Sequence, residues 1–242
     1  MTKVKVFDLL YTVTSLDVLS KDILEKKYNK KMIVTPNVDH IVRFNKDLNF
    51  RNTYFNADVV VNDSKVVNLF SKLINMPIGY TIPGSDLTES IFNNIKNYVD
   101  INITVIGGDS NLMAKLCDKY ALKNITHYNP PMNFHTKLKE MNKCLDLCKR
   151  TKADIIFLAV GSPKQELVAE LLKKNGVDGC YLCIGASLLF LTGQEKRASK
   201  FIQKMHCEWL FRLVNNPRRL FKRYLVDGLS IFPIVYRQIK NK

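Results

Sequence analysis

Polar residues that could do chemistry follow several short apolar runs of the sequence. These segments are Thr35-Pro36-Asn37, Asn62-Asp63-Ser64, Gly107-Gly108-Asp109-Ser110 and Gly161-Ser162-Pro163-Lys164-Gln165-Glu166. A carboxylate such as Asp63 can act as a general base that removes a proton from a hydroxyl group. The two glycines of the third segment can offer backbone N–H groups to a phosphate where a helix begins. Together the segments favour a pocket, although they do not name a reaction.

Taken one at a time, these segments are more typical of helix N-caps than of catalytic groups, because Asp, Ser and Asn are preferred at caps. The GGDS segment lacks the GxGxxG spacing of dinucleotide sites, and the sequence contains no GxxxxGK[ST] phosphate loop. The four histidines, His40, His127, His135 and His206, show no HExxH spacing, and no GxSxG elbow is present. By elimination, Asp63 is the best candidate for a general base.

Six short apolar runs are expected to form the strands that position these residues. They are Met32–Thr35, Ala57–Asn62, Ile101–Gly107, Asn124–Tyr128, Asp154–Val160 and Gly179–Ile184. Helical patterns lie between them, at Val38–Leu48, Lys65–Leu73, Ser85–Tyr98, Ser110–Tyr120, Phe134–Lys149 and Lys164–Lys174. This alternation predicts a Rossmann-like α/β fold, with a mostly parallel sheet covered by helices on both faces. Ligands in such sheets bind where strand ends meet helix N-termini.

Cys180 and Cys183 form a CxxC pair within the apolar run GCYLCIG. A zinc site needs a second pair of ligands at a suitable spacing, and none is obvious. We therefore expect buried thiols in a strand and predict neither a metal nor a cofactor.

The chain is strongly basic, with 37 Lys and Arg against 22 Asp and Glu and a net charge of +15. Such a charge predicts an anionic partner: a nucleic acid, a nucleotide or an acidic membrane. The N-terminus lacks the apolar core of a signal peptide, and no run reaches the length of a spanning helix. The sequence therefore predicts a cytoplasmic or membrane-peripheral protein.

Basic residues concentrate after Gly193, which predicts two parts: a catalytic α/β domain at 1–194 and a basic helical appendage at 195–242. Arg212, Arg219 and Arg223 would share one face of a helix. A neighbouring stripe holds apolar residues: Trp209, Leu213, Leu220 and Tyr224. Such an amphipathic segment could lie on anionic lipid or bind phosphates there. The alternative is a helix that packs on its own domain with a solvated basic face.

Seven segments taken together resemble one known family. In chain order they read TPNVDHIV, ADVVVNDSKVV, PGSDL, ITVIGGD, ADIIFLAVGSPKQE, IGASLLFLTGQEKRA and EWLFRLVNNPRRLFKRYL. Their order and spacing resemble the WecG/TagA/CpsF glycosyltransferases from about residue 31 to residue 226. GSPKQE and the arginine-rich tail are the most specific of these matches.

The resemblance implies an inverting, metal-independent transfer of a sugar from a UDP-sugar to a polyprenyl-diphosphate-linked glycan. Such steps build bacterial surface polysaccharides at the inner face of the plasma membrane, so an anionic membrane surface is a further expected partner. Some members form homo-oligomers, and a nucleic-acid partner is not expected.

Site residues carry over from the matching segments. Asp63 matches the general base that is proposed for the family. The substrate-binding positions are Thr35, Asn37, Gly84, Ser85, Asp86, Gly107, Gly108, Asp109, Gly161, Lys164, Gln165, Arg212, Arg219 and Arg223. Among these, the three arginines match the basic appendage that is thought to close the site over the membrane-borne acceptor.

Some positions depart from the family pattern. Thr81 stands where many members have an arginine before the GSDL element, and Leu189 replaces a frequent aspartate. The donor sugar therefore stays open between an N-acetylhexosamine and a hexose. Two other functions remain as alternatives: a family member that binds UDP-sugar without catalysis, and a basic nucleic-acid-binding protein.

Overall fold

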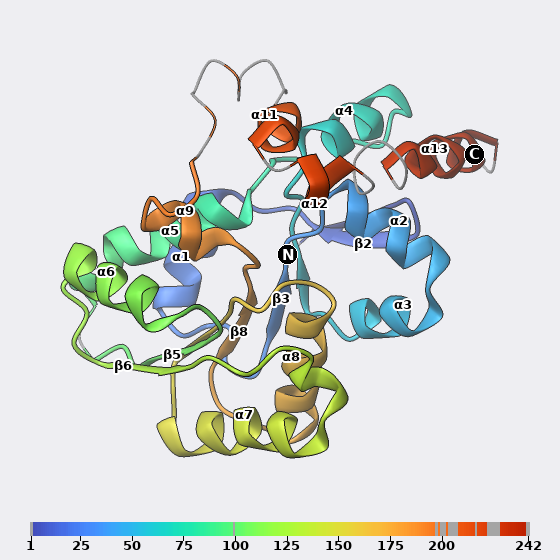
Figure 1. Cartoon of the computed structure of the whole chain (residues 1–242). Coiled ribbons are helices and arrows are strands. Elements are labelled where there is room, and N and C mark those ends of the chain that lie inside the picture. The colour runs from blue at the N-terminus through green and yellow to red at the C-terminus, as the bar shows by residue number, and fades with distance from the viewer. Residues whose placement is uncertain are drawn as a thin grey trace.

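A parallel sheet forms the centre of the protein, with the strand order β4-β3-β8-β7-β5-β6 (Figure 1). The strands are β3 (Met32–Val34), β4 (Val59–Val60), β5 (Ile103–Ile106), β6 (Ile125–Tyr128), β7 (Ile155–Leu158) and β8 (Cys180–Cys183). The computed structural model describes residues 2–98, 100–196, 198, 202, 208–215, 217–221 and 228–240. Each strand lies within a run predicted from the sequence, and the Rossmann-like fold class is confirmed.

The central strands are almost entirely apolar because both faces of the sheet are covered. In β7, Ile155 and Phe157 belong to one buried cluster, whereas Ile156 and Leu158 belong to the other. This alternation follows from the period of two residues in a strand. All four side chains are fully buried, which explains why the sequence run IIFL carries no polar residue.

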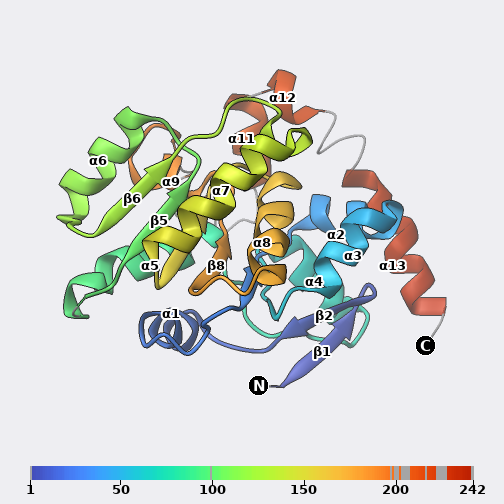
Figure 2. The same cartoon turned by 90° about the horizontal axis from the view of Figure 1, so that it is seen from below.

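Helices cover both faces of the sheet (Figure 2). On one face lie α2 (Val38–Lys46), α3 (Leu48–Phe55), α7 (Leu138–Thr151) and α8 (Lys164–Lys174). On the other face lie α1 (Leu16–Leu24), α5 (Gly84–Asn94), α6 (Ser110–Tyr120) and α9 (Ser187–Leu191). Helix α4 (Lys65–Leu73) follows β4, and short 3-10 turns occur at Ile95–Asn97, Phe134–Thr136 and Gly228–Ser230. Among the described residues, no helix is long and apolar enough to cross a membrane.

Three predicted helices have the bounds expected from the sequence, at α4, α6 and α8. The helix predicted at Val38–Leu48 ends earlier, because Asp47 adopts an extended conformation between α2 and α3. The Asp47 carboxylate accepts hydrogen bonds from the N–H groups of Asn49 and Phe50, so this residue is the N-cap of α3.

An N-terminal hairpin is absent from the sequence-based prediction. Strands β1 (Lys3–Val6) and β2 (Leu9–Thr12) pair antiparallel, and Val6 lies opposite Leu9. The two turn residues, Phe7 and Asp8, both have positive φ, at 53° and 64°. A tight hairpin turn needs this conformation, and glycine or asparagine normally marks it in the sequence. With neither residue present, the hairpin carries no turn signal.

The C-terminal segment forms α11 (Glu208–Asn215), α12 (Pro217–Phe221) and α13 (Ile231–Lys240). Helix α13 packs on the α/β domain, because Ile231 and Ile234 belong to the buried core. The side chain of Gln238 accepts a hydrogen bond from the N–H of Phe7 at 3.1 Å. Helix α13 of the predicted appendage thus packs on the α/β domain.

The tail arginines that were predicted to bind substrate are placed only in part. Arg212 lies in α11 and Arg219 in α12, but their side chains are outside the described part of the structure. Arg223 lies entirely outside the described residues.

Both cysteines of the CxxC pair are buried in β8, on opposite faces of the sheet. Cys180 belongs to one core cluster and Cys183 to the other. Burial raises the pKa of both thiols well above the usual range. The prediction of buried thiols within a strand is confirmed.

Candidate functional site

Strands β3 and β8 are neighbours in the sheet, and the connections that leave the strands run in opposite directions on the two sides of this pair. From β3 the chain moves outward to the edge strand β4, and β5 lies on the other side of β8 and β7. In open parallel sheets, ligands bind in the crevice that this divergence leaves. The predicted site segments at residues 35–37 and 161–166 follow β3 and β7, next to this crevice.

Thr35, Gly84 and Ser187 lie together at the carboxyl ends of β3 and β8. A Cβ atom on Gly84 would lie 2.9 Å from the Thr35 hydroxyl and 3.5 Å from the Ser187 hydroxyl. Gly84 is the first residue of α5, so the N-terminus of this helix is directed at the two hydroxyl groups. Free N–H groups and the helix dipole at such a terminus favour an anion. A side chain at position 84 would press against the Thr35 hydroxyl, so glycine allows this close approach.

Asp63 lies beside the segment that follows β3. The N–H of Asp63 donates a hydrogen bond to the carbonyl oxygen of Pro36 at 3.0 Å. The Asp63 side chain is half-buried, so it combines contact with solvent and a fixed backbone. The structure thus brings the candidate base next to Thr35 and Asn37.

Buried Asn62 fixes the loop that carries Asp63. The Asn62 side chain donates to the carbonyl oxygen of Ser64 at 2.9 Å and accepts from the Ser64 N–H at 3.0 Å. The same amide donates to the hydroxyl of Thr81 at 3.4 Å, and Asn68 donates to this hydroxyl at 3.3 Å. Thr81 stands where many family members have an arginine, and here it supports the loop of the candidate base.

Gln165 joins the segment after β7 to the segment after β8. Its side-chain oxygen accepts a hydrogen bond from the N–H of Gly185 at 2.8 Å. Its amide nitrogen donates to Glu166 Oε1 at 3.0 Å. Because both ends of the amide are engaged, its oxygen and nitrogen are held in defined directions.

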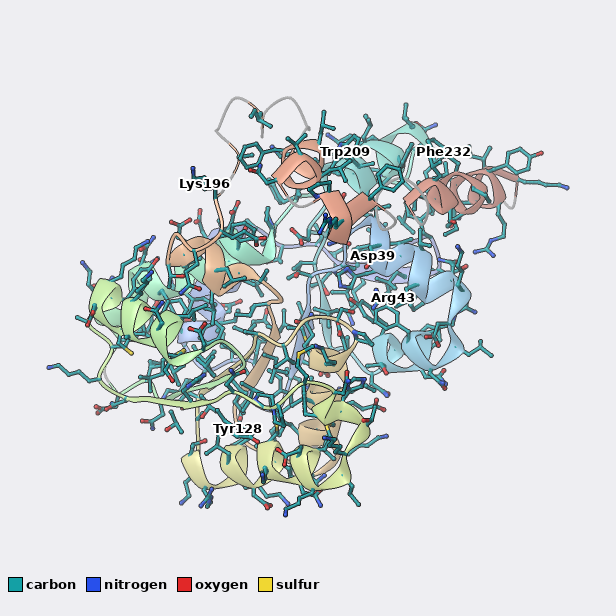
Figure 3. The ribbon with its side chains drawn as sticks, viewed as in Figure 1. Asp39, Arg43, Tyr128, Lys196, Trp209 and Phe232 are labelled. Atoms are coloured by element: carbon teal, nitrogen blue, oxygen red, sulfur yellow. The ribbon has the colours of Figure 1, made fainter. Side chains whose placement is uncertain are left out.

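Asn37 is the N-cap of α2, and its side chain accepts a hydrogen bond from the N–H of Asp39. Nδ1 of His40 lies 2.8 Å from the side-chain oxygen of Asn37. Farther along α2, Arg43 pairs with Asp39 at 3.1 Å and donates to the Ser162 hydroxyl at 3.2 Å (Figure 3). Helix α2 is thus tied through Arg43, in its last turn, to the segment after β7.

The glycine pair after β5 is shaped by close packing. Gly107 has a φ of +105°, and a Cβ atom there would lie 2.7 Å from the carbonyl oxygen of Ala159. Nε2 of His127 lies within hydrogen-bonding distance of the carbonyl oxygens of both Gly107 and Gly108, at 3.2 and 3.0 Å. The Asp109 carboxylate caps α6 by accepting from the N–H of Leu112 at 2.7 Å. This segment lies next to the segment that follows β7, and Asp109 serves as the N-cap of α6.

The other predicted site residues lie at helix N-termini. Ser85 is buried in the first turn of α5 and donates to the Asp86 carboxylate at 3.4 Å. Gly161 has a φ of +76° with open space where a Cβ atom would lie. Lys164 is the first residue of α8, next to Gln165.

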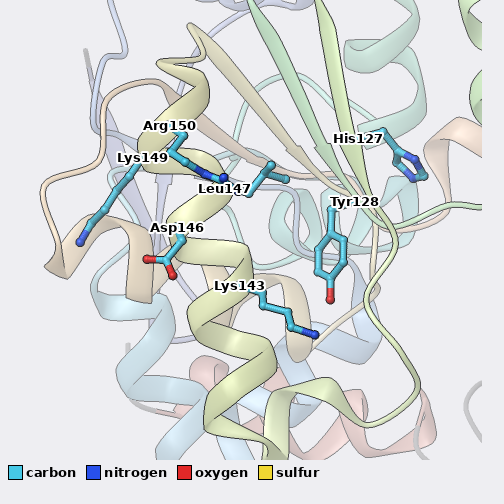
Figure 4. Close-up of a pocket in the computed structure, with 7 residues that line it drawn as sticks. All are labelled: His127, Tyr128, Lys143, Asp146, Leu147, Lys149 and Arg150. Carbon is cyan, nitrogen blue, oxygen red and sulfur yellow. The ribbon is translucent and has the colours of Figure 1, made fainter.

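A separate groove of about 650 Å³ lies beside the edge strand β6 (Figure 4). It is lined by His127, Tyr128, Lys143, Asp146, Leu147, Lys149 and Arg150. Within it, the Tyr128 hydroxyl donates to Glu140 at 2.6 Å, and burial together with this carboxylate raises the pKa of Tyr128 to about 12. Two of these lining residues, His127 and Tyr128, contact the predicted site segment at Gly107, the latter through a hydrogen bond from the Gly107 N–H to the Tyr128 carbonyl oxygen at 2.8 Å.

Sequence reasoning missed three residues of the strand-end site: Glu166, His40 and Ser187. Glu166 was part of the quoted GSPKQE segment, and the spacing of Asn37 and His40 matches a capping box, which the structure contains. These signals could have indicated His40 as a partner of Asn37. Ser187 carried no comparable signal.

The glycosyl transferase WecG/TagA/CpsF family profile matches residues 4–242 of the chain. One relative is the N-acetylglucosaminyldiphosphoundecaprenol N-acetyl-beta-D-mannosaminyltransferase of Bacillus spizizenii, which is 25% identical over 167 residues. The match covers 67% of this chain and 63% of the relative, which is less than two thirds of the relative's length. Because the family profile spans nearly the whole chain, the resemblance seen in the sequence is confirmed, and the chain belongs to the glycosyl transferase WecG/TagA/CpsF family.

Proposed function

We propose that the protein transfers a sugar from a UDP-sugar to a polyprenyl-diphosphate-linked glycan, with inversion at the anomeric carbon and without a metal. The sugar is an N-acetylhexosamine or a hexose, and the product enters bacterial surface polysaccharide synthesis. The name of the Bacillus relative describes transfer of N-acetylmannosamine to a lipid-diphosphate-linked N-acetylglucosamine. Family membership supports the same class of reaction here.

The observation that carries this proposal is that Thr35, Gly84 and Ser187 lie together at the carboxyl ends of β3 and β8, with Asp63 on the adjoining loop. The N-terminus of α5 and the Thr35 hydroxyl suit a diphosphate, while the Ser187 hydroxyl donates to the carbonyl oxygen of Ile184 at 2.6 Å. A half-buried carboxylate on the neighbouring segment suits a general base.

In the proposed reaction, Asp63 removes the proton from the acceptor hydroxyl. The hydroxyl oxygen then attacks the anomeric carbon, and the bond from that carbon to the UDP oxygen breaks on the opposite face. The departing diphosphate carries the negative charge. We assign the stabilisation of this charge to the N–H groups at the start of α5, to Lys164 and to the tail arginines.

The proposal is tested by incubating the full chain with a panel of UDP-sugars and a polyprenyl-diphosphate-sugar acceptor. We expect acceptor-dependent release of UDP from one donor, and the same rate after addition of EDTA. Silence across the panel while UDP still binds would support the alternative of a family member without catalysis. Turnover that EDTA abolishes and Mg²⁺ restores would contradict the metal-free mechanism.

We further propose that the protein docks on the inner face of the plasma membrane through α4 and α13. These helices meet where Phe70 packs edge-on against Phe232, with ring centroids 5.8 Å apart. They leave large apolar side chains exposed: Leu69, Leu73, Phe232, Tyr236 and Ile239. Lys72 and Lys240 on the same helices, and the net charge of +15, suit anionic lipid. Trp209 and Phe232 lie on the same side of the molecule (Figure 3).

Replacing both Leu69 and Leu73 with serine is expected to weaken binding to anionic vesicles about tenfold or more, because these side chains are 53% and 68% exposed and would enter the lipid. Co-sedimentation with vesicles measures the effect. The matched control replaces Met132 and Leu138, which are 82% and 77% exposed near α7, at the opposite end in Figure 1. Equal weakening by both pairs would contradict docking through α4.

A further inference from the structure

Glu166 is fully buried next to the predicted substrate-binding residue Gln165, and its presence there needs an explanation. Its side chain is 0% exposed, and its Oε2 atom has no hydrogen-bond partner among the described residues. A buried carboxyl group with an unpaired oxygen is costly to the folded state. Nonpolar packing would suit this position better if Glu166 served only the stability of α8.

The position of Gln165 depends on Glu166. An amide side chain can rotate to exchange its oxygen and nitrogen, and two contacts oppose this exchange here. The N–H of Gly185 donates to Gln165 Oε1 at 2.8 Å, so this position needs an oxygen. Gln165 Nε2 donates to Glu166 Oε1 at 3.0 Å, so this position needs a nitrogen. With these two contacts made, the second N–H of the amide is left for a ligand.

Glu166 also faces the N-terminal turns of α2. Nε2 of His40 lies 3.9 Å from Glu166 Oε1, while Nδ1 of the same ring lies 2.8 Å from the side-chain oxygen of Asn37. His40 is 8% exposed, so water screens this contact little. One carboxyl group therefore adjoins the supports of both Gln165 and Asn37.

We propose that Glu166 is a positioning residue of the active site, which holds the Gln165 amide in register with Gly185 and faces the imidazole that supports Asn37. The inference rests on the proposed function, in which Gln165 and Asn37 contact the substrate. Glu166 itself contacts no substrate and acts through these two residues.

The groups that face Glu166 come from four elements. They are His40 and Arg43 from α2, Tyr54 from α3, Cys183 from β8, and Ser162 and Gln165 around the start of α8. Burial raises the pKa of Glu166, although the hydrogen bond from Gln165, the nearby Ser162 hydroxyl and the charge of Arg43 act in the opposite direction. To accept the hydrogen bond from Gln165, residue 166 needs one carbonyl-type oxygen and no charge. Glutamine can therefore replace Glu166 in this contact.

The test compares Glu166→Met, which fills a similar volume without an acceptor, with Glu166→Gln, which keeps one. We expect Glu166→Met to lose about 10- to 100-fold in kcat/KM and Glu166→Gln to stay within about threefold of the parent. Adding Glu166→Met to Gln165→Ala should cost clearly less than Glu166→Met costs in the parent, because the Gln165 contact is already gone and only the contact with His40 is left to lose. Losses that multiply in the double variant would overturn the proposal.

A second readout needs no turnover. The exchange rate of the Gly185 amide hydrogen, followed by NMR, should rise about tenfold in Glu166→Met and stay unchanged in Glu166→Gln. Glu170→Met is the matched control, because Glu170 lies one turn along α8 and bonds Asn56 and Thr53 instead.

If Glu166→Met fails to fold, Glu166→Asp takes its place. Its side chain is one methylene shorter, so its carboxylate no longer reaches Gln165, and exchange at Gly185 should again be faster. Unchanged exchange in a folded variant would overturn the proposal. Changed exchange in a protein that transfers no sugar would instead refute the proposed function.

Discussion

Asp63→Asn is expected to lower kcat by about 10²- to 10⁴-fold, because the loss of a general base has an effect of this size. Asparagine has the same shape as aspartate but cannot accept the proton of the acceptor hydroxyl. The loop should keep its structure, since the Asp63 backbone N–H bonds Pro36 and the Asn62 side chain bonds Ser64. UDP binding, measured by calorimetry, should therefore stay within about threefold of the parent, and single-turnover assays measure the chemical step.

Asp47→Asn is the matched control for this result. Asp47 is not among the predicted site residues, and its carboxylate caps α3 through the N–H groups of Asn49 and Phe50. Asparagine is an equally good N-cap, so stability and kcat should change little. If Asp63→Asn turned over within tenfold of the parent, another group would have to be the base.

Gly107→Ala is expected to lower the free energy of unfolding by about 3 kcal/mol or more, because it combines overpacking with backbone strain. The new Cβ atom would lie 2.7 Å from the carbonyl oxygen of Ala159 and 2.9 Å from a methyl group of Val160. Gly107 also has a φ of +105°, a backbone conformation that residues with a side chain rarely adopt. Urea unfolding followed by circular dichroism measures the loss.

Gly161→Ala separates these two causes. Gly161 also has a positive φ, at +76°, but a Cβ atom there meets nothing within 4 Å. Only the backbone strain remains, so the loss should be about 1 kcal/mol. Equal losses at both positions would mean that the contact with Ala159 relaxes at no cost.

The six strands could be predicted because each is a short apolar run between polar turns, and burial on both faces leaves no polar residue in strands such as β7. Elements whose limits depend on single residues were harder to predict. The hairpin turn at Phe7 and Asp8 has a left-handed backbone without glycine, and the break between α2 and α3 depends on the extended backbone of Asp47. Tertiary packing, which the local sequence does not encode, stabilises both.

The position of the candidate site could be predicted from the sequence, but the contacts between its residues could not. Thr35, Asn37 and Gln165 follow strands, and the carboxyl ends of parallel strands lie at one edge of the sheet. That Glu166 lies beside His40 could not be predicted, because the two residues are far apart in the sequence. The roles of Asp63 and Gln165 remain predictions until their variants are measured.

The contact between the hairpin and α13 has a consequence for how the protein is made. The N–H of Phe7 bonds Gln238, and Asp8 pairs with Arg237, so the hairpin is completed by α13, a helix far along the chain. On the ribosome, the hairpin emerges long before this partner exists. The turn at Phe7 and Asp8 must therefore wait, without these contacts, until α13 has been translated and has left the ribosome.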